Sequence, residues 1–333
     1  MKKLLFSLVA TIVGAMGMYA QNSYVATLDH EGTITCYYGS SAISYAVNAS
    51  VDGDVITVSA GIFNSFSISG KAITIRGAGI LKGNDNAYTS IMSGTTCSIG
   101  SNVTIEGIRF ANVWYNSGTN GTTFNKCTFQ TLKQGSAQSA MENCTFVNCI
   151  INIIQMNNYC KDNIFRNCYI AGYITGSTPY FYNATLINSF IRYNNSINNC
   201  NFTNCIISTN QIGASNSLAY CICINNSTFT EYQYYGSCDK TNCVYGTTDF
   251  YGLFKSWNDA IDTDNVNASS FELTDDAKAT YLGIDGTQVG MLGGDYPYSP
   301  VVSIPRITTC EVAEKATADG KLNVNIAVTA PTE

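Results

Sequence analysis

A short motif that recurs about every twenty residues is the feature that most constrains this fold. The motif is ENCTFVNC, Glu142 to Cys149, in which two cysteines five residues apart each follow an asparagine. Related stretches end at Cys168, Cys205 and Cys243. A period near twenty predicts a solenoid, in which each repeat forms one coil and packs only on its neighbours.

The repeats can be aligned on the first cysteine of the motif. This alignment places seven residues in one register, namely Cys127, Cys144, Asn163, Ala184, Cys200, Cys221 and Cys238. The register five residues later holds Cys149, Cys168, Ser189, Cys205, Asn226 and Cys243. Because the steps vary from 16 to 21 residues, we expect coils with loops of different length.

Alternation within one coil predicts which side chains point inward. Cys144 and Phe146 share one face of a short strand, and Thr145 faces the other way. Asn148 marks a bend, because asparagine tolerates the left-handed conformation and bonds to nearby backbone. We therefore expect the bend residues to stack as a ladder in which each amide bonds the one above it: Asn148, Asn167, Asn204 and Asn242.

The cysteines have three interpretations. The first is a structural ladder of free, buried thiols, since cysteine packs as a small apolar residue; its members would be Cys144, Cys149, Cys168, Cys200, Cys205, Cys221, Cys238 and Cys243. The second is disulfides, which 14 cysteines in an exported chain could form. Stacked residues have parallel Cβ directions that oppose the disulfide dihedral angle. The third, a zinc site, is disfavoured because the single histidine lies outside the repeats.

The amino terminus resembles a secretory signal peptide. Lys2 and Lys3 precede an apolar run, and Ala20 supplies a small residue at the expected cleavage point. We therefore expect a secreted, periplasmic or bacterial cell-surface protein with no membrane span after cleavage. A net charge of −6 argues against a nucleic-acid partner, because such partners select a basic face.

Three further stretches carry a resemblance to a known family. SSAISYAVNASVDGDVITVSAGIF is similar to an N-terminal cap, KAITIRGAG to an early coil, and LGIDGTQVGMLGGDYPYSP to a closing coil. In these stretches the chain resembles the right-handed parallel β-helix proteins of the pectin-lyase-like superfamily. The resemblance implies an all-β fold, a single-stranded right-handed parallel β-helix. It does not imply one activity, because this fold carries lyases, hydrolases, esterases and adhesins.

The organisation expected from these features has four parts. They are a signal peptide (residues 1–20), an N-terminal cap with a short helix over Ala42 to Asn48 (21–54), about twelve coils (55–302) and a tail (303–333). Thr274 is expected to cap a short helix that runs to Leu282. The tail is expected to form a β-hairpin that turns near Gly320 and docks on the solenoid or on a partner chain.

No catalytic residue can be assigned. The resemblance implies that a lyase would need a basic residue with acidic Ca²⁺ ligands, and a hydrolase needs paired carboxylates. From Gly107 to Thr230 the only carboxylates are Glu142 and Asp162, at different phases of their coils. No cofactor is expected, although the stretch Asp262 to Asn267 could offer oxygens to Ca²⁺ as an alternative to an ordinary polar turn.

Aromatic residues are the remaining candidates for a binding surface. Tyrosine offers a flat apolar ring and a hydroxyl, which suit sugar rings. The candidate ligand-binding residues are Trp114, in an expected loop, and Tyr180, Tyr182, Tyr232, Tyr234 and Tyr235. In the alternative interpretation, half of these rings pack in the core and the rest only cover the surface.

The sequence thus favours a secreted or surface β-helix without catalysis that binds an extracellular polysaccharide or surface glycan, or acts in adhesion. A polysaccharide lyase or glycoside hydrolase is the enzymatic alternative. A purely structural surface rod is the third.

Overall fold

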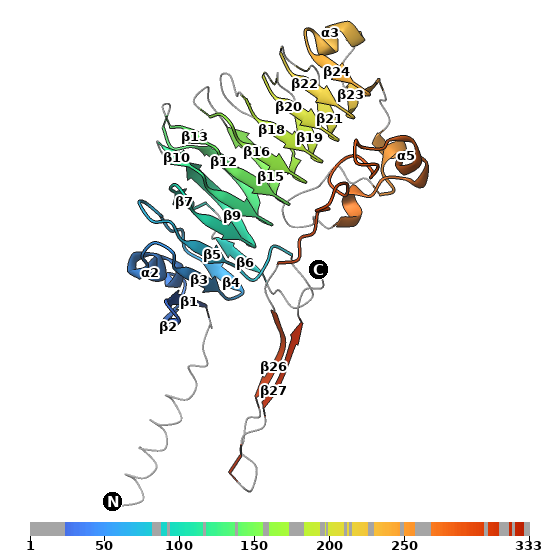
Figure 1. Cartoon of the computed structure of the whole chain (residues 1–333). Coiled ribbons are helices and arrows are strands. Elements are labelled where there is room, and N and C mark those ends of the chain that lie inside the picture. The colour runs from blue at the N-terminus through green and yellow to red at the C-terminus, as the bar shows by residue number, and fades with distance from the viewer. Residues whose placement is uncertain are drawn as a thin grey trace, which may run out of the picture.

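The computed structural model describes residues 24–81, 88–91, 94–115, 118–136, 139–155, 160–172, 183–193, 197, 199–209, 212, 215–225, 230–246, 250–256, 268–302, 306–312, 320–321 and 324–329. These residues confirm the expected all-β fold, because they form a parallel β-solenoid in which two long sheets run along the molecule (Figure 1). The predicted signal peptide lies outside the described residues.

The first sheet has twelve strands. Their order is β2 (Thr33–Tyr38), β1 (Val25–His30), β3 (Val55–Val58), β5 (Thr74–Arg76), β8 (Thr104–Glu106), β11 (Thr123–Asn125), β14 (Thr145–Val147), β16 (Ile164–Arg166), β18 (Thr185–Ile187), β20 (Asn201–Thr203), β22 (Ser217–Ala219) and β24 (Asp239–Thr241). From β3 onward the pairs are parallel, so each strand belongs to a new coil.

The second sheet has eleven strands. Along its main path lie β4 (Gly61–Phe63), β6 (Thr89–Ile91), β9 (Ile108–Tyr115), β12 (Thr128–Gln134), β15 (Ile150–Gln155), β17 (Tyr169–Ile170), β19 (Phe190–Tyr193), β21 (Ile206–Thr209), β23 (Ile222–Asn225) and β25 (Val244–Tyr245). Strand β7 (Thr96–Ile99) also pairs with β9, and β10 (Thr119–Asn120) pairs with β13 (Met141–Glu142) in a small separate sheet.

Left-handed residues make the corners of each coil. The corner between the two long sheets, here called the second corner, has φ near +50° at Asn148, Asn167, Asn188, Asn204 and Asn242. A first corner, just before each strand of the twelve-stranded sheet, has the same conformation at Asn102, Asn143, Asp162, Asn183 and Asn199. Asparagine and aspartate adopt this conformation at lower cost than other residues with a Cβ. Both asparagines of the recurring motif are therefore corner residues.

The core contains a column of phenylalanines. Phe124, Phe146 and Phe165 occupy the same register in successive strands. Their rings stack, with centroids 5.1 Å and 4.8 Å apart and interplanar angles of 14° and 7°. Like residues therefore lie directly over like residues, as the coil spacing of about 4.8 Å requires.

The cysteines fall into two inner columns, and the register corrects the sequence alignment. Cys144, Cys200 and Cys238 share the first column, because the residue after each pairs along the twelve-stranded sheet. Cys127 and Cys221, which the alignment placed with them, belong instead to the second column with Cys149, Cys168, Ser189, Cys205 and Cys243. Asn216 takes the place in the first column that was predicted for Cys221.

Hydrogen bonds explain why cysteine alternates with polar residues in these columns. The thiol of Cys168 donates to the carbonyls of Phe146 and Arg166 at 3.4 and 3.3 Å. Ser189, one coil later, donates in the same way to Phe165 and Ile187 at 3.3 and 2.9 Å. Its hydroxyl also accepts from the Cys168 amide at 3.1 Å. Each small polar group thus adds a hydrogen bond at a corner, where the carbonyls of Arg166 and Ile187 also accept from the amides of Asn148 and Asn167.

The amino-terminal end of the solenoid is closed by its own elements. Helix α2 (Ala42–Ala49) buries Ala42, Ile43 and Ala46 against the core. Strand β1 pairs antiparallel with β2 on one side and with β3 on the other. His30 Nδ1 lies 2.8 Å from Asp54 Oδ1 and links β1 to the turn before β3.

Among the described residues the parallel coils have their last strand at β25, so the predicted extension of about twelve coils to residue 302 is wrong. Beyond them lie α4 (Phe250–Leu253), a 3₁₀ helix η1 (Ala268–Phe271) and α5 (Asp275–Thr280). Thr274 caps α5 as predicted, but the helix stops at Thr280 and does not reach Leu282. These elements lie along one side of the solenoid (Figure 1) and form a second hydrophobic cluster with outward residues of the eleven-stranded sheet, including Tyr169, Phe190 and Ile206.

The segment after α5, residues 283–294 and here called the strap, crosses the second corner and replaces the expected asparagine ladder. Asn167 Nδ2 donates to the carbonyls of Met291 and Gly293 at 2.8 and 2.9 Å. Asn204 Oδ1 accepts from the Ile284 amide at 2.9 Å. The side chains of Asn167, Asn188 and Asn204 thus bond the strap rather than one another, because the strap brings backbone groups within their reach.

The tail forms the predicted hairpin. Strands β26 (Arg306–Val312) and β27 (Val324–Thr329) pair antiparallel around the turn that contains Gly320. The hairpin projects away from the solenoid in Figure 1. Docking of this hairpin on a partner chain stays a prediction.

Candidate ligand-binding site

Trp114 was expected to lie in a loop, but it lies in strand β9. Its side chain is 37% exposed. Lys133, its neighbour in register on β12, places Nζ 5.4 Å from the centroid of the indole ring. The amine therefore covers one face of the indole ring, and a sugar would need that face for stacking.

The predicted tyrosines do not form one aromatic surface. Tyr232, on helix α3 (Glu231–Tyr235), is 83% exposed. Tyr235 is buried, so its assignment to a binding surface is wrong; α3 folds it over the end of the core, 5.6 Å from the ring of Tyr245. The structure does not describe the side chain of Tyr234, and both Tyr180 and Tyr182 lie outside the described residues.

The inner thiols are poor nucleophiles. The thirteen cysteines whose side chains the structure describes are thiols without a disulfide bond, and Cys36 is the exposed one among them. Burial raises the pKa of Cys144 to about 11 and that of Cys200 to about 12. Since the thiolate is the nucleophile and the metal ligand, protonated thiols of this kind serve packing.

No metal centre is found among the described residues, where no group of three or more His, Cys, Asp or Glu side chains is arranged around a common point. The stretch Asp262 to Asn267 lies outside the described residues, so Ca²⁺ binding there stays a prediction.

A hollow surface lies where α5 meets the last coils. Two adjoining hollows of about 370 and 210 Å³ share Thr280 and Tyr281, and together they are called the end groove here. The larger is lined by Gly252, Leu253, Thr274, Asp276 and Ala277 as well. The smaller adds Tyr220, Cys221, Ile222, Asn242, Val244, Leu282 and Val289.

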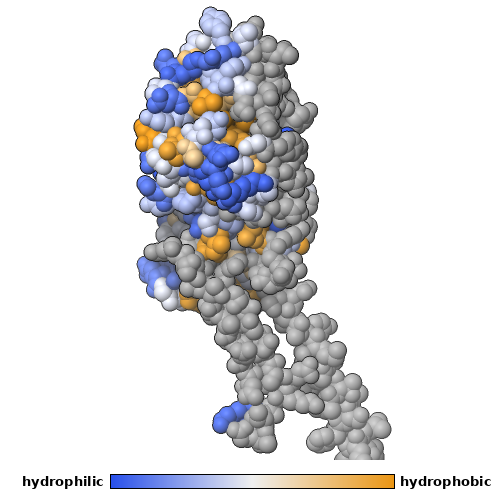
Figure 2. Space-filling view, turned by 90° about the vertical axis from the view of Figure 1, so that its right-hand side faces the viewer, coloured by the Kyte–Doolittle hydropathy of each residue, from blue (hydrophilic) through white to orange (hydrophobic). Residues whose placement is uncertain are grey.

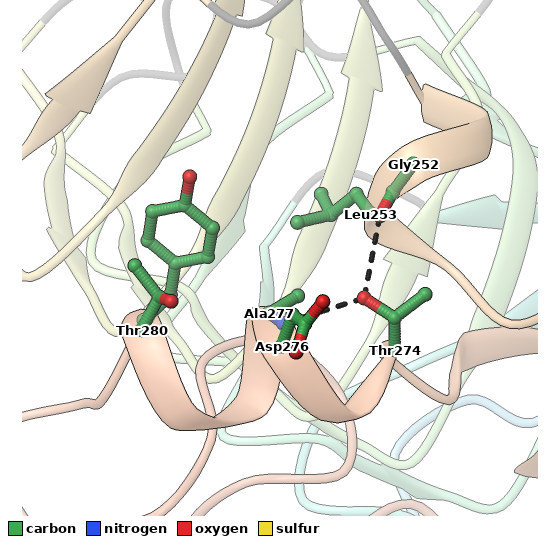
Figure 3. A pocket seen from close by; sticks show the side chains of 7 residues that line it. Gly252, Leu253, Thr274, Asp276, Ala277 and Thr280 are labelled. Carbon is green, nitrogen blue, oxygen red and sulfur yellow. Dashed lines mark hydrogen bonds between the residues drawn. The ribbon is translucent and has the colours of Figure 1, made fainter.

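Helix capping holds the larger hollow open. Thr274 Oγ1 accepts from the Ala277 amide at 3.3 Å and donates to the Gly252 carbonyl at the same distance. Figure 3 shows this link between α4 and α5, with Leu253 facing α5 across the hollow. The hydroxyl therefore fixes the start of α5 and its distance from α4.

Two tyrosines from distant parts of the chain meet at the smaller hollow. Tyr220 is a second-corner residue with φ +54°, and Tyr281 is the C-cap of α5. Both are partly exposed. Asn242 and Thr280 add an amide and a hydroxyl beside the rings. Aromatic faces flanked by neutral hydrogen-bonding groups are suited to a ligand that has apolar faces and hydroxyl edges.

The surface around the end groove is mixed in polarity. Figure 2 views the molecule from the side of α5 and shows hydrophobic residues between strongly hydrophilic ones. Leu282 and Ile284 contribute to the hydrophobic part, since they are 48% and 64% exposed.

Two carboxylates near the end groove, Glu272 and Asp275, are held by lysines, whereas Asp276 lines the larger hollow itself. Lys255 Nζ lies 3.0 Å from Glu272 and 3.1 Å from Asp275, and Lys278 Nζ lies 2.8 Å from Glu272. These hydrogen bonds and charges lower the pKa of Glu272 to about 2. A carboxyl group with so low a pKa stays ionised at neutral pH and is unsuited to be the general acid of a glycosidase.

A second hollow, of about 360 Å³, lies near the amino-terminal end and is lined by polar residues that include Asp52, Lys71 and Ser101. Lys71 Nζ donates to the carbonyls of Val47 and Asn48 at 2.6 and 3.0 Å. This amine therefore caps the carboxyl end of α2, which leaves the end groove as the stronger candidate.

No protein-family model, no curated protein and no solved structure matches this chain. Within the described part of the chain, every helix is too short or too polar to span a membrane.

Proposed function

We propose that this protein binds a neutral carbohydrate in the end groove and does not cleave it. The observation that carries the proposal is the meeting of Tyr220 and Tyr281 at one hollow beside Asn242 and Thr280. Tyrosine rings can stack on the apolar faces of sugar rings, while the amide and hydroxyl groups can exchange hydrogen bonds with sugar hydroxyls.

The wider setting of the proposal is an exported β-solenoid of the pectin-lyase-like superfamily. The parallel coils and the amino-terminal cap support membership of that superfamily, and the signal-like residues 1–20 support a secreted or surface location. The lysine contacts of Glu272 and Asp275 favour binding over hydrolysis, and Asp276 is the single carboxylate among the described residues that line the end groove, where a hydrolase needs a pair.

The test is a glycan array followed by calorimetric titration of the best soluble oligosaccharide. Tyr220→Asn removes the ring and keeps a residue that suits the left-handed corner, as Asn204 and Asn242 do. Tyr281→Leu removes the other ring and keeps apolar bulk. Each change is expected to weaken binding at least tenfold, about 1.4 kcal/mol.

Tyr232→Ala is the matched control, since this tyrosine is exposed and does not line the end groove. The Tyr232→Ala variant is expected to bind the oligosaccharide as tightly as the parent does. Equal loss in all three variants, or no glycan bound by the parent, contradicts the proposal. Release of reducing or unsaturated ends from a polysaccharide would replace it with the enzymatic alternative.

A further inference from the structure

The outer face of the twelve-stranded sheet carries a regular row of small polar residues. In strands β11, β14, β16, β18, β20 and β22 the first residues are Thr123, Thr145, Ile164, Thr185, Asn201 and Ser217. They are aligned in one register from strand to strand. The outward side of these six strands is called the hydroxyl face here.

The hydroxyl face is accessible and flat. In each of the six strands the middle residue is buried and the two flanking residues are partly or fully exposed. Their pairing continues without a bulge. α5 and the strap lie elsewhere, over the eleven-stranded sheet and the second corner. Five steps of about 4.8 Å extend the row over about 24 Å.

The charge of the hydroxyl face restricts its partner. Arg166 is the single charged residue among the outward positions of the six strands. At the limits of the face lie Glu106, which is buried, and Asp239, which is exposed. A strongly anionic polymer or membrane would need a basic surface, so charge complementarity selects a neutral partner.

The shape of the hydroxyl face favours an ordered polymer over a folded protein. Protein partners usually insert aromatic or arginine anchors into pockets, and the outward residues of these six strands include no aromatic side chain. Threonine, serine and asparagine supply both donors and acceptors at every strand except β16, where Ile164 stands in the row. A flat surface that repeats hydroxyl groups can match this row over its whole length.

We propose that the hydroxyl face binds the ordered surface of an insoluble neutral polysaccharide, such as a crystalline glucan or chitin. The contact would consist of many weak hydrogen bonds and methyl contacts in register, so affinity would depend on the order of the polymer. The proposal does not rest on the end groove, which lies on a different surface and suits single sugar chains.

The experiment is a depletion assay of the full chain on crystalline and amorphous preparations of cellulose and chitin. We expect retention on at least one crystalline polymer and at least tenfold weaker retention on its amorphous form. Thr145→Lys and Thr185→Lys place bulky charges in the row and are each expected to weaken crystalline binding at least tenfold. Thr145→Ser keeps the hydroxyl group and is expected to bind within twofold of the parent.

Thr35→Lys is the matched control, because Thr35 is an exposed strand residue of the same sheet in the antiparallel cap. Circular dichroism melting establishes that each variant is folded. Tyr220→Asn is expected to retain binding to crystalline polymer, and Thr145→Lys is expected to retain binding to soluble oligosaccharide. The two variants therefore distinguish failure of the end groove from failure of the hydroxyl face. Equal retention of Thr145→Lys and the parent would overturn the proposal. So would retention that does not distinguish crystalline from amorphous polymer, or adsorption to ice crystals in the absence of polysaccharide binding.

Discussion

Replacing Asn167 tests the two roles of the second corner, namely its backbone conformation and its bonds to the strap. Asn167→Ala places an alanine at φ +50°, which costs about 1–2 kcal/mol. It also removes the hydrogen bonds to Met291 and Gly293, each worth about 0.5–1.5 kcal/mol net. The sum is a loss of about 2–5 kcal/mol in the free energy of unfolding.

Two variants separate the contributions. Asn167→Gly tolerates the left-handed conformation and loses only the bonds, so about 1–3 kcal/mol is expected. Asn242→Ala changes an exposed corner of the same conformation and is expected to lose about 1–2 kcal/mol. The assay is urea unfolding followed by circular dichroism, with midpoints and slopes compared. The reasoning is refuted if Asn167→Gly is as stable as the parent, or if both alanine variants lose the same amount.

Three other predictions concern single side chains. The pairing with Asp54 raises the pKa of His30, and the Val51 amide and His30 lower the pKa of Asp54. The pair therefore stabilises the fold most between pH 3.8 and 6.5, the ordinary pKa values of the two groups, less as pH rises through the folded pKa of His30 and less as pH falls through that of Asp54. Melting of His30→Ala should lack the change at high pH and keep part of the change at low pH, because the Val51 amide still lowers the pKa of Asp54. Cys168→Ser should cost less than about 1.5 kcal/mol in urea unfolding, because Ser189 makes equivalent bonds one coil later; a larger loss contradicts that equivalence. In the folded protein Cys36 should react with Ellman's reagent in seconds and Cys168 only after unfolding, since one is exposed and the other buried; fast labelling of Cys168 contradicts the burial.

The fold could be predicted because each coil repeats the same local sequence pattern. ENCTFVNC contains both corners of one coil, the inward phenylalanine and one residue of each inner column. Each choice depends only on strand alternation and on the tolerance of asparagine for left-handed backbone. The amino-terminal cap and the tail hairpin are local in the same sense, so α2 and β26–β27 were also foreseen.

The register could be predicted only in part, because the motif resembles itself after a shift of five residues. Cys144 and Cys149 each follow an asparagine, so a coil that is five residues shorter or longer aligns almost as well. Cys127 and Cys221 were misplaced for this reason. Backbone pairing of Thr128 with Ile150 and of Ile206 with Ile222 decides the true register.

The end groove and the strap could not be predicted, because their parts are far apart in sequence. Tyr220 and Tyr281 belong to different elements, and Asn167 meets a strap more than 120 residues later. Tyr235 was misjudged because strand alternation was applied to a segment that forms a helix. The hydroxyl face had a visible signal, since threonine or another small polar residue stands before the inward residue of most coils.

A double-mutant cycle on the phenylalanine column measures the stacking of successive coils directly. Phe146→Leu and Phe165→Leu place a residue that the column already holds at Leu186. Because the rings of Phe146 and Phe165 stack 4.8 Å apart, their coupling in urea unfolding is predicted to be about 0.5–1.5 kcal/mol. Phe146 and Phe202 lie three coils apart in the same column, and their coupling should fall below about 0.5 kcal/mol. Equal couplings for the two pairs, or no coupling between Phe146 and Phe165, would contradict the stacked register.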